Sequence, residues 1–307
     1  MVYEYALEPE LVATWTDRRD FRYFIERFGL GQGRVVSRYP KRWAALVWEA
    51  FGGTGDLDRK RLEELLAHFK ERMVRRTDIR WEPDLAWLAN AEREHERRPF
   101  HAILARTNPR RSEYVLIGEE VDELSTPLWS VDRAPPAREA YEMANALAPL
   151  LRCSSVVIFV DPYIGQGRSD HRRTIEAFLD RTMRGRPGPR PDRVEIHTAA
   201  ETCGSDDFIR ARFRGCVPDG LHVVVRRLEQ RQSGEKLHNR YVLTDLGGVL
   251  FGIGLDQGAA GETEDITLLN RIQYELRWAQ YAAGDSPAAF EQPERTVEVI
   301  GTRRLLG

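Results

Sequence analysis

The sequence predicts an α/β protein in which a mixed sheet flanked by helices follows a mainly helical N-terminal domain. From residue 154 onward, short β-branched runs alternate with amphipathic stretches, as expected of a sheet covered by helices. Before residue 97, apolar side chains recur mostly at helical spacing. A chain of 307 residues can hold two ordinary domains. We place their boundary near Pro135, which gives domains at residues 1–134 and 135–307.

The N-terminal domain is expected to consist of helices and one short strand pair. Helical spacing covers about Asp17–Phe28, Pro40–Phe51, Asp58–Val74 and Pro83–Glu96. The two strands are expected at Pro99–Thr107 and Glu113–Gly118, with a turn at 108–111 between them. We expect this domain to contribute contacts to a substrate or to a protein partner.

The C-terminal domain is expected to alternate strands and helices. Its first strand, Ser154–Asp161, is a continuous β-branched run, which is typical of a strand buried on both faces. Further strands are expected at Val194–Thr198 and Leu221–Leu228, followed by a hairpin within Lys236–Asp256, all in one sheet. Helices are expected at about Pro136–Leu151, Ser169–Met183, Asp206–Arg214 and Leu268–Tyr281.

The hairpin carries the pattern His-x-Arg-x4-Asp, formed by His238, Arg240 and Asp245. We expect a strand from 237 to 244, and residues two apart on a strand point to the same face. His238 and Arg240 would therefore share a face. A titratable imidazole beside a permanent cation suits a phosphate ligand.

This spacing resembles the His-x-Lys-x4-Asp signature of the phospholipase D superfamily, in which a glycine follows seven residues after the Asp, as Gly252 does here. Arg240 stands in place of the family Lys, Ile253 in place of a Ser or Thr, and Leu255 in place of an Asn. The His-x-Arg and Gly-x-Gly-Leu-Asp runs are also similar to the phospholipase D-like C-terminal domain of microtubule-interacting-and-transport proteins, a binding module. The resemblance covers roughly residues 150 to 300.

The resemblance implies cleavage of phosphodiesters without a metal or other cofactor. His238 would be the nucleophile that forms a phosphohistidine, and Arg240 would hold the non-bridging oxygens. Glu264, with Glu262 as the second candidate, would fix the tautomer of the imidazole. Since the chain has one signature, the second histidine would be His238 of a second subunit in a homodimer, unless another histidine is recruited.

Three further residues are assigned supporting roles. Asp245 is expected to brace the hairpin turn. Asp161 and Tyr163 follow the first strand and are expected to line the pocket, although for Asp161 a turn-forming role before Pro162 is an equal alternative.

Composition bears on the partner and the compartment. The net charge is −2, but arginines cluster around the expected site, which favours nucleic acid as the ligand. Only four of the 46 basic residues are Lys, so Arg240 is consistent with overall Arg usage. Three scattered cysteines and the absence of a signal peptide or long apolar run indicate a cytoplasmic protein with no metal site and no membrane contact.

Two functions therefore compete. The first is a metal-independent nuclease, in bacterial defence by fold-level analogy. The second is a catalytically degraded module that binds phosphate groups, nucleic acid or a protein. Ile253 and Leu255 favour the second, because aliphatic side chains cannot donate the hydrogen bonds that Ser, Thr or Asn supply.

Overall fold

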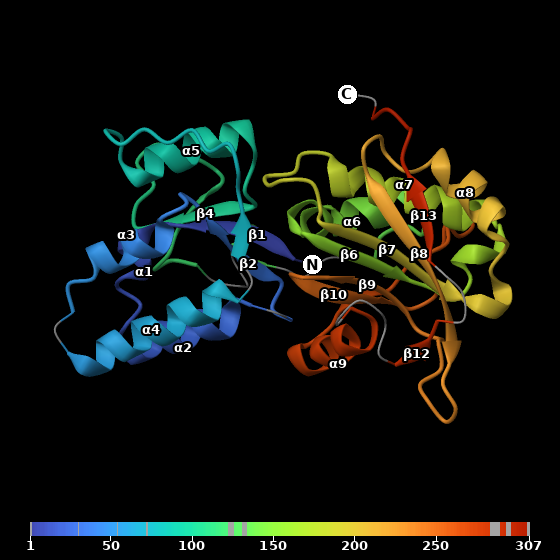
Figure 1. The fold of residues 1–307 in the computed structure, drawn as a ribbon. Helices are drawn as coiled ribbons and strands as arrows, with labels where there is room; N and C mark the ends of the chain where they lie inside the picture. Colours follow the sequence, from blue (N-terminus) through green and yellow to red (C-terminus); the bar gives the residue numbers. More distant parts are fainter. Residues whose placement is uncertain are drawn as a thin grey trace. The chain divides into compact units, whose positions relative to one another are not determined.

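The structure, a computed structural model, describes residues 2–29, 31–53, 55–71, 73–121, 126–130, 134–282, 289–292 and 296–305. It is a mixed α/β protein with one parallel and one mixed sheet (Figure 1). The chain divides into two compact units. Unit 1 comprises Met1–Asp132 and Pro187–Pro189, and unit 2 comprises Arg133–Arg186 and Arg190–Gly307. This division falls close to the boundary expected near Pro135.

Unit 1 is built around a five-stranded parallel sheet with the order β3-β2-β1-β4-β5. Its strands are β1 (Tyr3–Leu7), β2 (Arg34–Arg38), β3 (Met73–Arg75), β4 (Ala102–Ala105) and β5 (Val115–Ile117). Its helices are α1 (Pro9–Val12), α2 (Arg18–Arg27), α3 (Trp43–Ala50), α4 (Asp56–Lys70) and α5 (Trp87–Arg97).

The expectation of a mainly helical domain with one strand pair was therefore wrong. The expected helices and the two expected strands are present, but β1, β2 and β3 join them in one sheet, and β4 and β5 run parallel. Successive side chains of β1 point to opposite faces of the sheet, so each face has its own hydrophobic core. Tyr5 and Leu7 pack with Phe24 of α2, while Ala6 packs with Trp87 of α5 on the other face.

Unit 2 contains an eight-stranded mixed sheet with the order β11-β10-β9-β6-β7-β8-β12, and β13 also pairs with β8. Its strands are β6 (Val156–Val160), β7 (Arg193–Ala199), β8 (His222–Gln230), β9 (Arg240–Thr244), β10 (Gly247–Phe251), β11 (Ile266–Leu268), β12 (Phe290–Glu291) and β13 (Val297–Ile300). Its helices are α6 (Ala140–Cys153), η1 (Ile164–Gln166), α7 (Ser169–Met183), η2 (Ala200–Thr202), α8 (Asp206–Arg214) and α9 (Arg271–Tyr281).

The five strands expected from Ser155 onward lie in this one sheet, as predicted. Strand β6 lies near its centre, parallel to β7 and antiparallel to β9. One face is covered by α6 and α7 (Figure 1). Phe178 of α7 stacks on Phe159 of β6 at 5.6 Å between ring centroids. The other face carries α9, whose Tyr281 ring lies 6.0 Å from the ring of Tyr241, measured between centroids. The sheet is therefore buried on both faces, which explains its continuous apolar strands.

Candidate phosphate site

Three segments far apart in the sequence meet at one edge of the unit 2 sheet. Register places the end of β6 beside the start of β9, with Val160 opposite Tyr241. It also places Arg240 opposite Phe251 at the end of β10. The turns that follow β6 and β10 therefore face each other next to Arg240. A pocket of about 160 Å³ opens there, lined by Arg138, Asp161, Tyr163, Arg168, His171, Arg240, Ile253, Gly254 and Asp256.

Asp161 is the buried acceptor at the centre of this edge. Its carboxylate accepts hydrogen bonds from the backbone N–H of Tyr163 at 2.8 Å and of Leu255 at 2.9 Å, so it ties the two turns together. The imidazole of His171 lies 3.6 Å from the same carboxylate. Burial alone would raise the pKa of Asp161, but His171 and the two backbone donors outweigh it and hold that pKa below its ordinary value. Asp161 is therefore ionised at neutral pH.

His171 is the histidine that lines the pocket. It lies in the first turn of α7, is 2% exposed, and directs Nε2 toward Asp161. Its Nδ1 is buried and has no hydrogen-bond partner among the described residues. A carboxylate beside an imidazole fixes the orientation of the ring.

Arg138 also lines the pocket, but carboxylates already neutralise its charge. It forms ion pairs with Asp256 at 2.5 Å, Glu262 at 3.1 Å and Glu264 at 3.2 Å. The buried Glu264 also accepts from the backbone N–H of Ile253 at 2.9 Å. Burial is the main reason that the pKa of Glu264 is raised. This network fixes the 252–264 segment and contributes little free charge to a ligand.

The surroundings of Arg240 differ from those of Arg138. Among the residues that the structure describes, no carboxylate lies within 4.0 Å of its guanidinium, and its Nε is buried without a hydrogen-bond partner. The guanidinium lies over the ring of Tyr163, 5.5 Å from the centroid. A partly buried cation without a partner costs free energy, so this site favours an anion.

The start of α7 adds to this preference. Arg168 precedes the helix as its N-cap residue, is exposed, and lines the pocket together with His171 of the first turn. The first four N–H groups of a helix have no partner within it, and the helix dipole is positive at that end. Two arginines and a helix N-terminus therefore converge on a space that suits one phosphate group.

His238 does not lie where the sequence predicted. It is in a turn, is exposed, and does not line the pocket, and the strand begins at Arg240. The reason is a lack of pairing partners. The ladder to β6 begins at Tyr241, and the ladder to β10 begins at Arg240 because the chain turns away after Phe251.

The other predicted residues are distributed as follows. Asp161 and Tyr163 line the pocket, as expected. Asp245 lies at the far end of β9 and braces the start of β6 by accepting from the N–H of Ser155 at 2.8 Å and of Val156 at 3.0 Å. A Cβ at Gly252 would meet its neighbours at ordinary contact distances of 3.5–3.6 Å, so packing does not require glycine there. The oxygens of Glu264 face Ile253 and Arg138, and no contact between Glu264 and His238 is present among the described residues.

Sequence reasoning missed the pocket roles of His171, Arg138 and Asp256. His171 does not match the signature spacing, because Phe178 occupies the position of the Asp. A usable signal was its place in the first turn of the helix that follows the Asp161 turn. Helix N-termini and strand ends meet at the same edge in α/β units.

Among the described residues, no group of three or more His, Cys, Asp or Glu side chains is arranged to hold a metal ion. No helix in the described part of the chain has the length and apolarity needed to cross a membrane. Comparisons with protein-family models, with curated proteins and with solved structures gave no match.

Proposed function

We propose that unit 2 binds the phosphodiester backbone of a nucleic acid, with one phosphate seated in the pocket at Arg240. The observation that carries this proposal is the guanidinium of Arg240, which has no carboxylate partner among the described residues and lies partly buried over Tyr163. A phosphate would supply the missing counter-charge, and the planar fork of Arg matches its oxygens. The phospholipase D-like fold proposed for this unit agrees with such a ligand.

An extended polyanion fits the pocket better than an isolated lipid head group. The pocket is small and opens between exposed side chains, including Tyr163 and Ile253, which are 37% and 51% exposed. Arg168 and Tyr163 can contact the phosphate or sugar on either side of the one that is bound. Nucleic acid is therefore the proposed ligand class.

The test is binding of fluorescent single-stranded DNA and RNA in EDTA, measured by anisotropy over a series of salt concentrations. Arg240→Ala should weaken binding and reduce the slope of log K against log salt by about 0.7, the value for one lost single-strand phosphate contact. Arg271→Ala is the matched control, since Arg271 is an exposed, ion-paired arginine on α9. An Arg240→Ala variant with wild-type affinity and slope would disprove the proposal.

A second candidate function, metal-independent cleavage of the bound strand, is favoured by one observation. The pocket contains the His171–Asp161 pair, so a second imidazole is available within the same chain. In this mechanism His238, which lies in the exposed turn two residues before Arg240 and outside the pocket, moves to the bound phosphate and attacks phosphorus. A P–N bond forms, the P–O bond to the leaving strand breaks, and protonated His171 gives a proton to the leaving oxygen. Water then hydrolyses the phosphohistidine and regenerates His238.

Cleavage is tested separately from binding. Wild-type protein should cut a labelled strand in EDTA, and both His238→Ala and His171→Gln should abolish cutting while leaving the anisotropy signal in place. An acid-labile phosphoprotein should form in the wild type during turnover and in neither variant, because His238→Ala lacks the nucleophile and His171→Gln lacks the proton donor for the leaving strand. Binding without any cleavage by the wild type would reject this second function and leave the first intact.

A further inference from the structure

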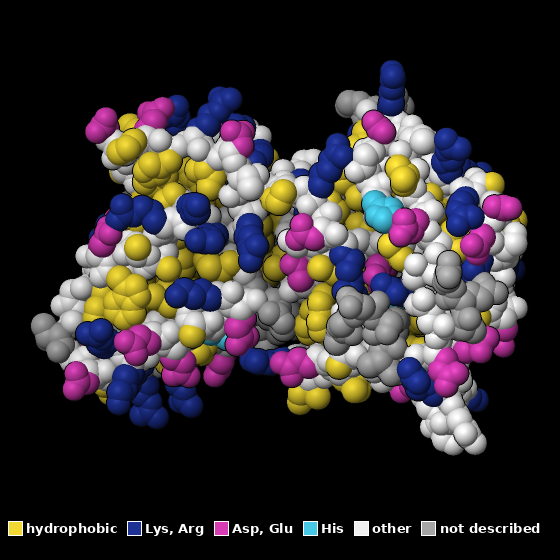
Figure 2. Space-filling view, viewed as in Figure 1, with side chains coloured by type: hydrophobic (Ala, Val, Ile, Leu, Met, Phe, Trp, Pro, Cys, Tyr) yellow, Lys and Arg dark blue, Asp and Glu magenta, His cyan; other side chains and the backbone are white. Residues whose placement is uncertain are grey.

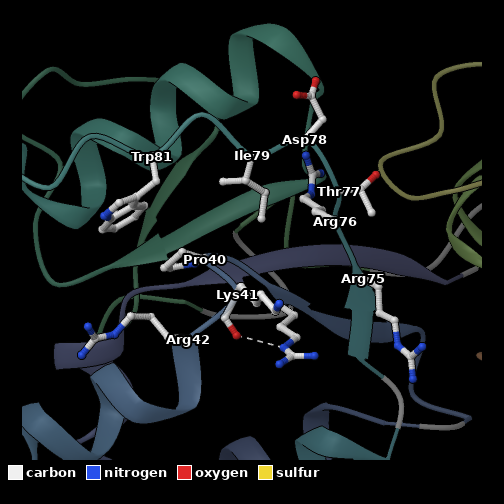
Figure 3. Close-up of a pocket in the computed structure, with 10 residues that line it drawn as sticks. Pro40, Lys41, Arg42, Arg75, Arg76, Thr77, Asp78, Ile79 and Trp81 are labelled. Atoms are coloured by element: carbon white, nitrogen blue, oxygen red, sulfur yellow. Dashed lines mark hydrogen bonds between the residues drawn. The ribbon is translucent and has the colours of Figure 1, made fainter.

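A second cavity, of about 920 Å³, lies in unit 1, where the chain leaves the carboxyl ends of β2 and β3. Its volume falls in the range of small-molecule sites, about 300–1,000 Å³. Residues 38–42 form one wall and residues 75–81 form the other (Figure 3). Ligands of parallel α/β sheets bind at this end of the strands.

The two walls present an apolar surface around an aromatic ring. Trp81 and Ile79 come from the segment after β3 and face Pro40, which follows β2 (Figure 3). The indole is half-buried, and its position is fixed by an edge contact to the buried Tyr39 at 5.9 Å between centroids. An anchored, partly exposed indole in a cavity is a platform on which a flat aromatic group can stack.

Two of the charged groups in the lining are already satisfied inside the protein. The side chain of Arg76 is fully buried and pairs with Glu4 at 2.8 Å and Glu94 at 3.0 Å. Asp78, the carboxylate among the described lining residues, pairs with Arg97 at 2.8 Å. These groups shape the cavity but offer no free charge to a ligand.

Three cations of the lining remain available. Arg38, Lys41 and Arg75 are exposed, and no ion pair joins any of them to a carboxylate in the part of the chain that the structure describes. Arg42 adds a fourth cation that is shared with Glu49. On this face of unit 1, basic side chains surround exposed hydrophobic ones between α5 and α4 (Figure 2). The cavity therefore combines an aromatic platform with an excess of positive charge at its edges.

We infer that this cavity binds a nucleotide unit, with the base stacked on Trp81 and the phosphate held by Arg38, Lys41 and Arg75. The ligand chemistry is an aromatic base joined to a phosphate, either in a free nucleotide or in a nucleotide of a single strand. An inorganic anion would leave the Trp81–Ile79–Pro40 surface uncovered. A purely apolar ligand would leave the cations uncompensated.

This site is separate from the pocket at Arg240, so it is tested in an Arg240→Ala background where the unit 2 site is silenced. Intrinsic tryptophan fluorescence is titrated with adenosine 5′-monophosphate, with a short single-stranded oligonucleotide and with inorganic phosphate. A saturable quench is expected with at least one of the first two probes. Quenching by the mononucleotide indicates a free nucleotide, and quenching by the oligonucleotide alone indicates a strand.

Variants assign the signal to the cavity. Trp81→Phe should abolish the quench and retain binding by calorimetry, because the phenyl ring still stacks. Trp81→Ala should weaken binding by about 5- to 150-fold, the range for a lost base–aromatic stack. Trp48→Phe is the matched control, since Trp48 lies on α3 outside the cavity.

Charge variants complete the test. Arg75→Ala and Lys41→Ala should each weaken binding of the nucleotide probe, whereas Arg19→Ala, an exposed arginine of α2, should not. The inference fails if neither nucleotide probe quenches fluorescence, if the quench survives in Trp81→Phe, or if polyglutamate competes as well as the oligonucleotide does.

Discussion

At the scale of single residues, the sequence signature identified Arg240 as a pocket residue but gave the wrong position for His238. Arg240 lies at the first position of β9, and cross-strand pairing with Phe251 fixes it at the edge of the sheet. His238 is two residues outside that ladder, so no pairing aligns its side chain with that of Arg240. The pattern of residue types was readable from the sequence, but the point where the strand loses its partners was not.

The Arg240→Lys variant tests whether the site requires a guanidinium group or whether Arg stands there only because the chain uses few lysines. We expect the Lys variant to bind single-stranded nucleic acid at least about tenfold more weakly than wild type, a loss of about 1.4 kcal/mol. An ammonium lacks the planar fork and stacks less well on Tyr163. Anisotropy titration at fixed salt measures the change. Equal affinity of the two proteins would mean that Arg stands there only because the chain uses few lysines.

At the scale of elements, five strands of unit 2, β6 to β10, could be predicted, whereas β11 to β13 of unit 2 and three strands of unit 1 could not. Strand β6 is a continuous run of five β-branched or aromatic residues, a pattern that few helices share. Strands β2 and β3 have only two apolar residues each, and β1 begins at Tyr3 without a preceding turn signal. Their identity depends on parallel pairing with distant segments, which no local pattern encodes.

Arg76, which follows β3, forms buried ion pairs that connect β3 to β1 and to α5. Its guanidinium contacts Glu4 of β1 and Glu94 of α5 and lies over the ring of Phe100 at 3.7 Å. Arg76→Ala leaves two carboxylates buried without this partner, so we expect it to destabilise unit 1 by about 3–5 kcal/mol. Urea unfolding monitored by tryptophan fluorescence measures this loss. The exposed neighbour Arg75, replaced by Ala, should unfold like the wild type.

Strands β7 and β8 of unit 2 share a second buried ionic cluster. Glu195 lies 2.7 Å from Nε2 of His197 and 2.8 Å from Arg226. Burial alone would raise the pKa of Glu195, but the hydrogen bonds from His197 and Arg226 lower it to about 2, from an ordinary value of 4.5. Because this pKa is lower in the folded state, the carboxylate stabilises the fold above pH 4.5, and this contribution is lost as the pH falls toward 2.

We therefore expect Glu195→Gln to be less stable than wild type by about 3 kcal/mol at pH 7, with the difference shrinking between pH 4.5 and 2. Urea unfolding at a series of pH values measures both curves. A difference that stays constant down to pH 2 would show that the Glu195 carboxylate does not titrate with a lowered pKa.

At the scale of the whole molecule, the candidate sites each belong to one unit of one chain. Every residue that lines the pocket at Arg240 comes from unit 2, and every residue that lines the cavity at Trp81 comes from unit 1. The homodimer expected from the single signature is therefore not needed to complete the phosphate pocket, and His171 supplies an imidazole without a second subunit.

This independence makes a prediction about assembly. The affinity for single-stranded nucleic acid, and any cleavage rate per chain, should stay constant from nanomolar to micromolar protein. Anisotropy and rate measurements across that range test it, with sedimentation velocity reporting the oligomeric state at each concentration. A rate per chain that rises as dimers form would instead support the two-subunit arrangement with paired His238 rings.

The pairing of β12 and β13 with β8 also limits which C-terminal truncations and tags the protein should tolerate. Both β12 and β13 pair with β8, so the final strands occupy a row of hydrogen-bonding groups that would otherwise lie open at the sheet margin. An open margin recruits strands from neighbouring molecules. A protein shortened to residue 282 should therefore self-associate through β8, visible as a rise in light scattering over time. With β12 and β13 present that margin is occupied, so expression tags are better attached after residue 307 than substituted for these strands.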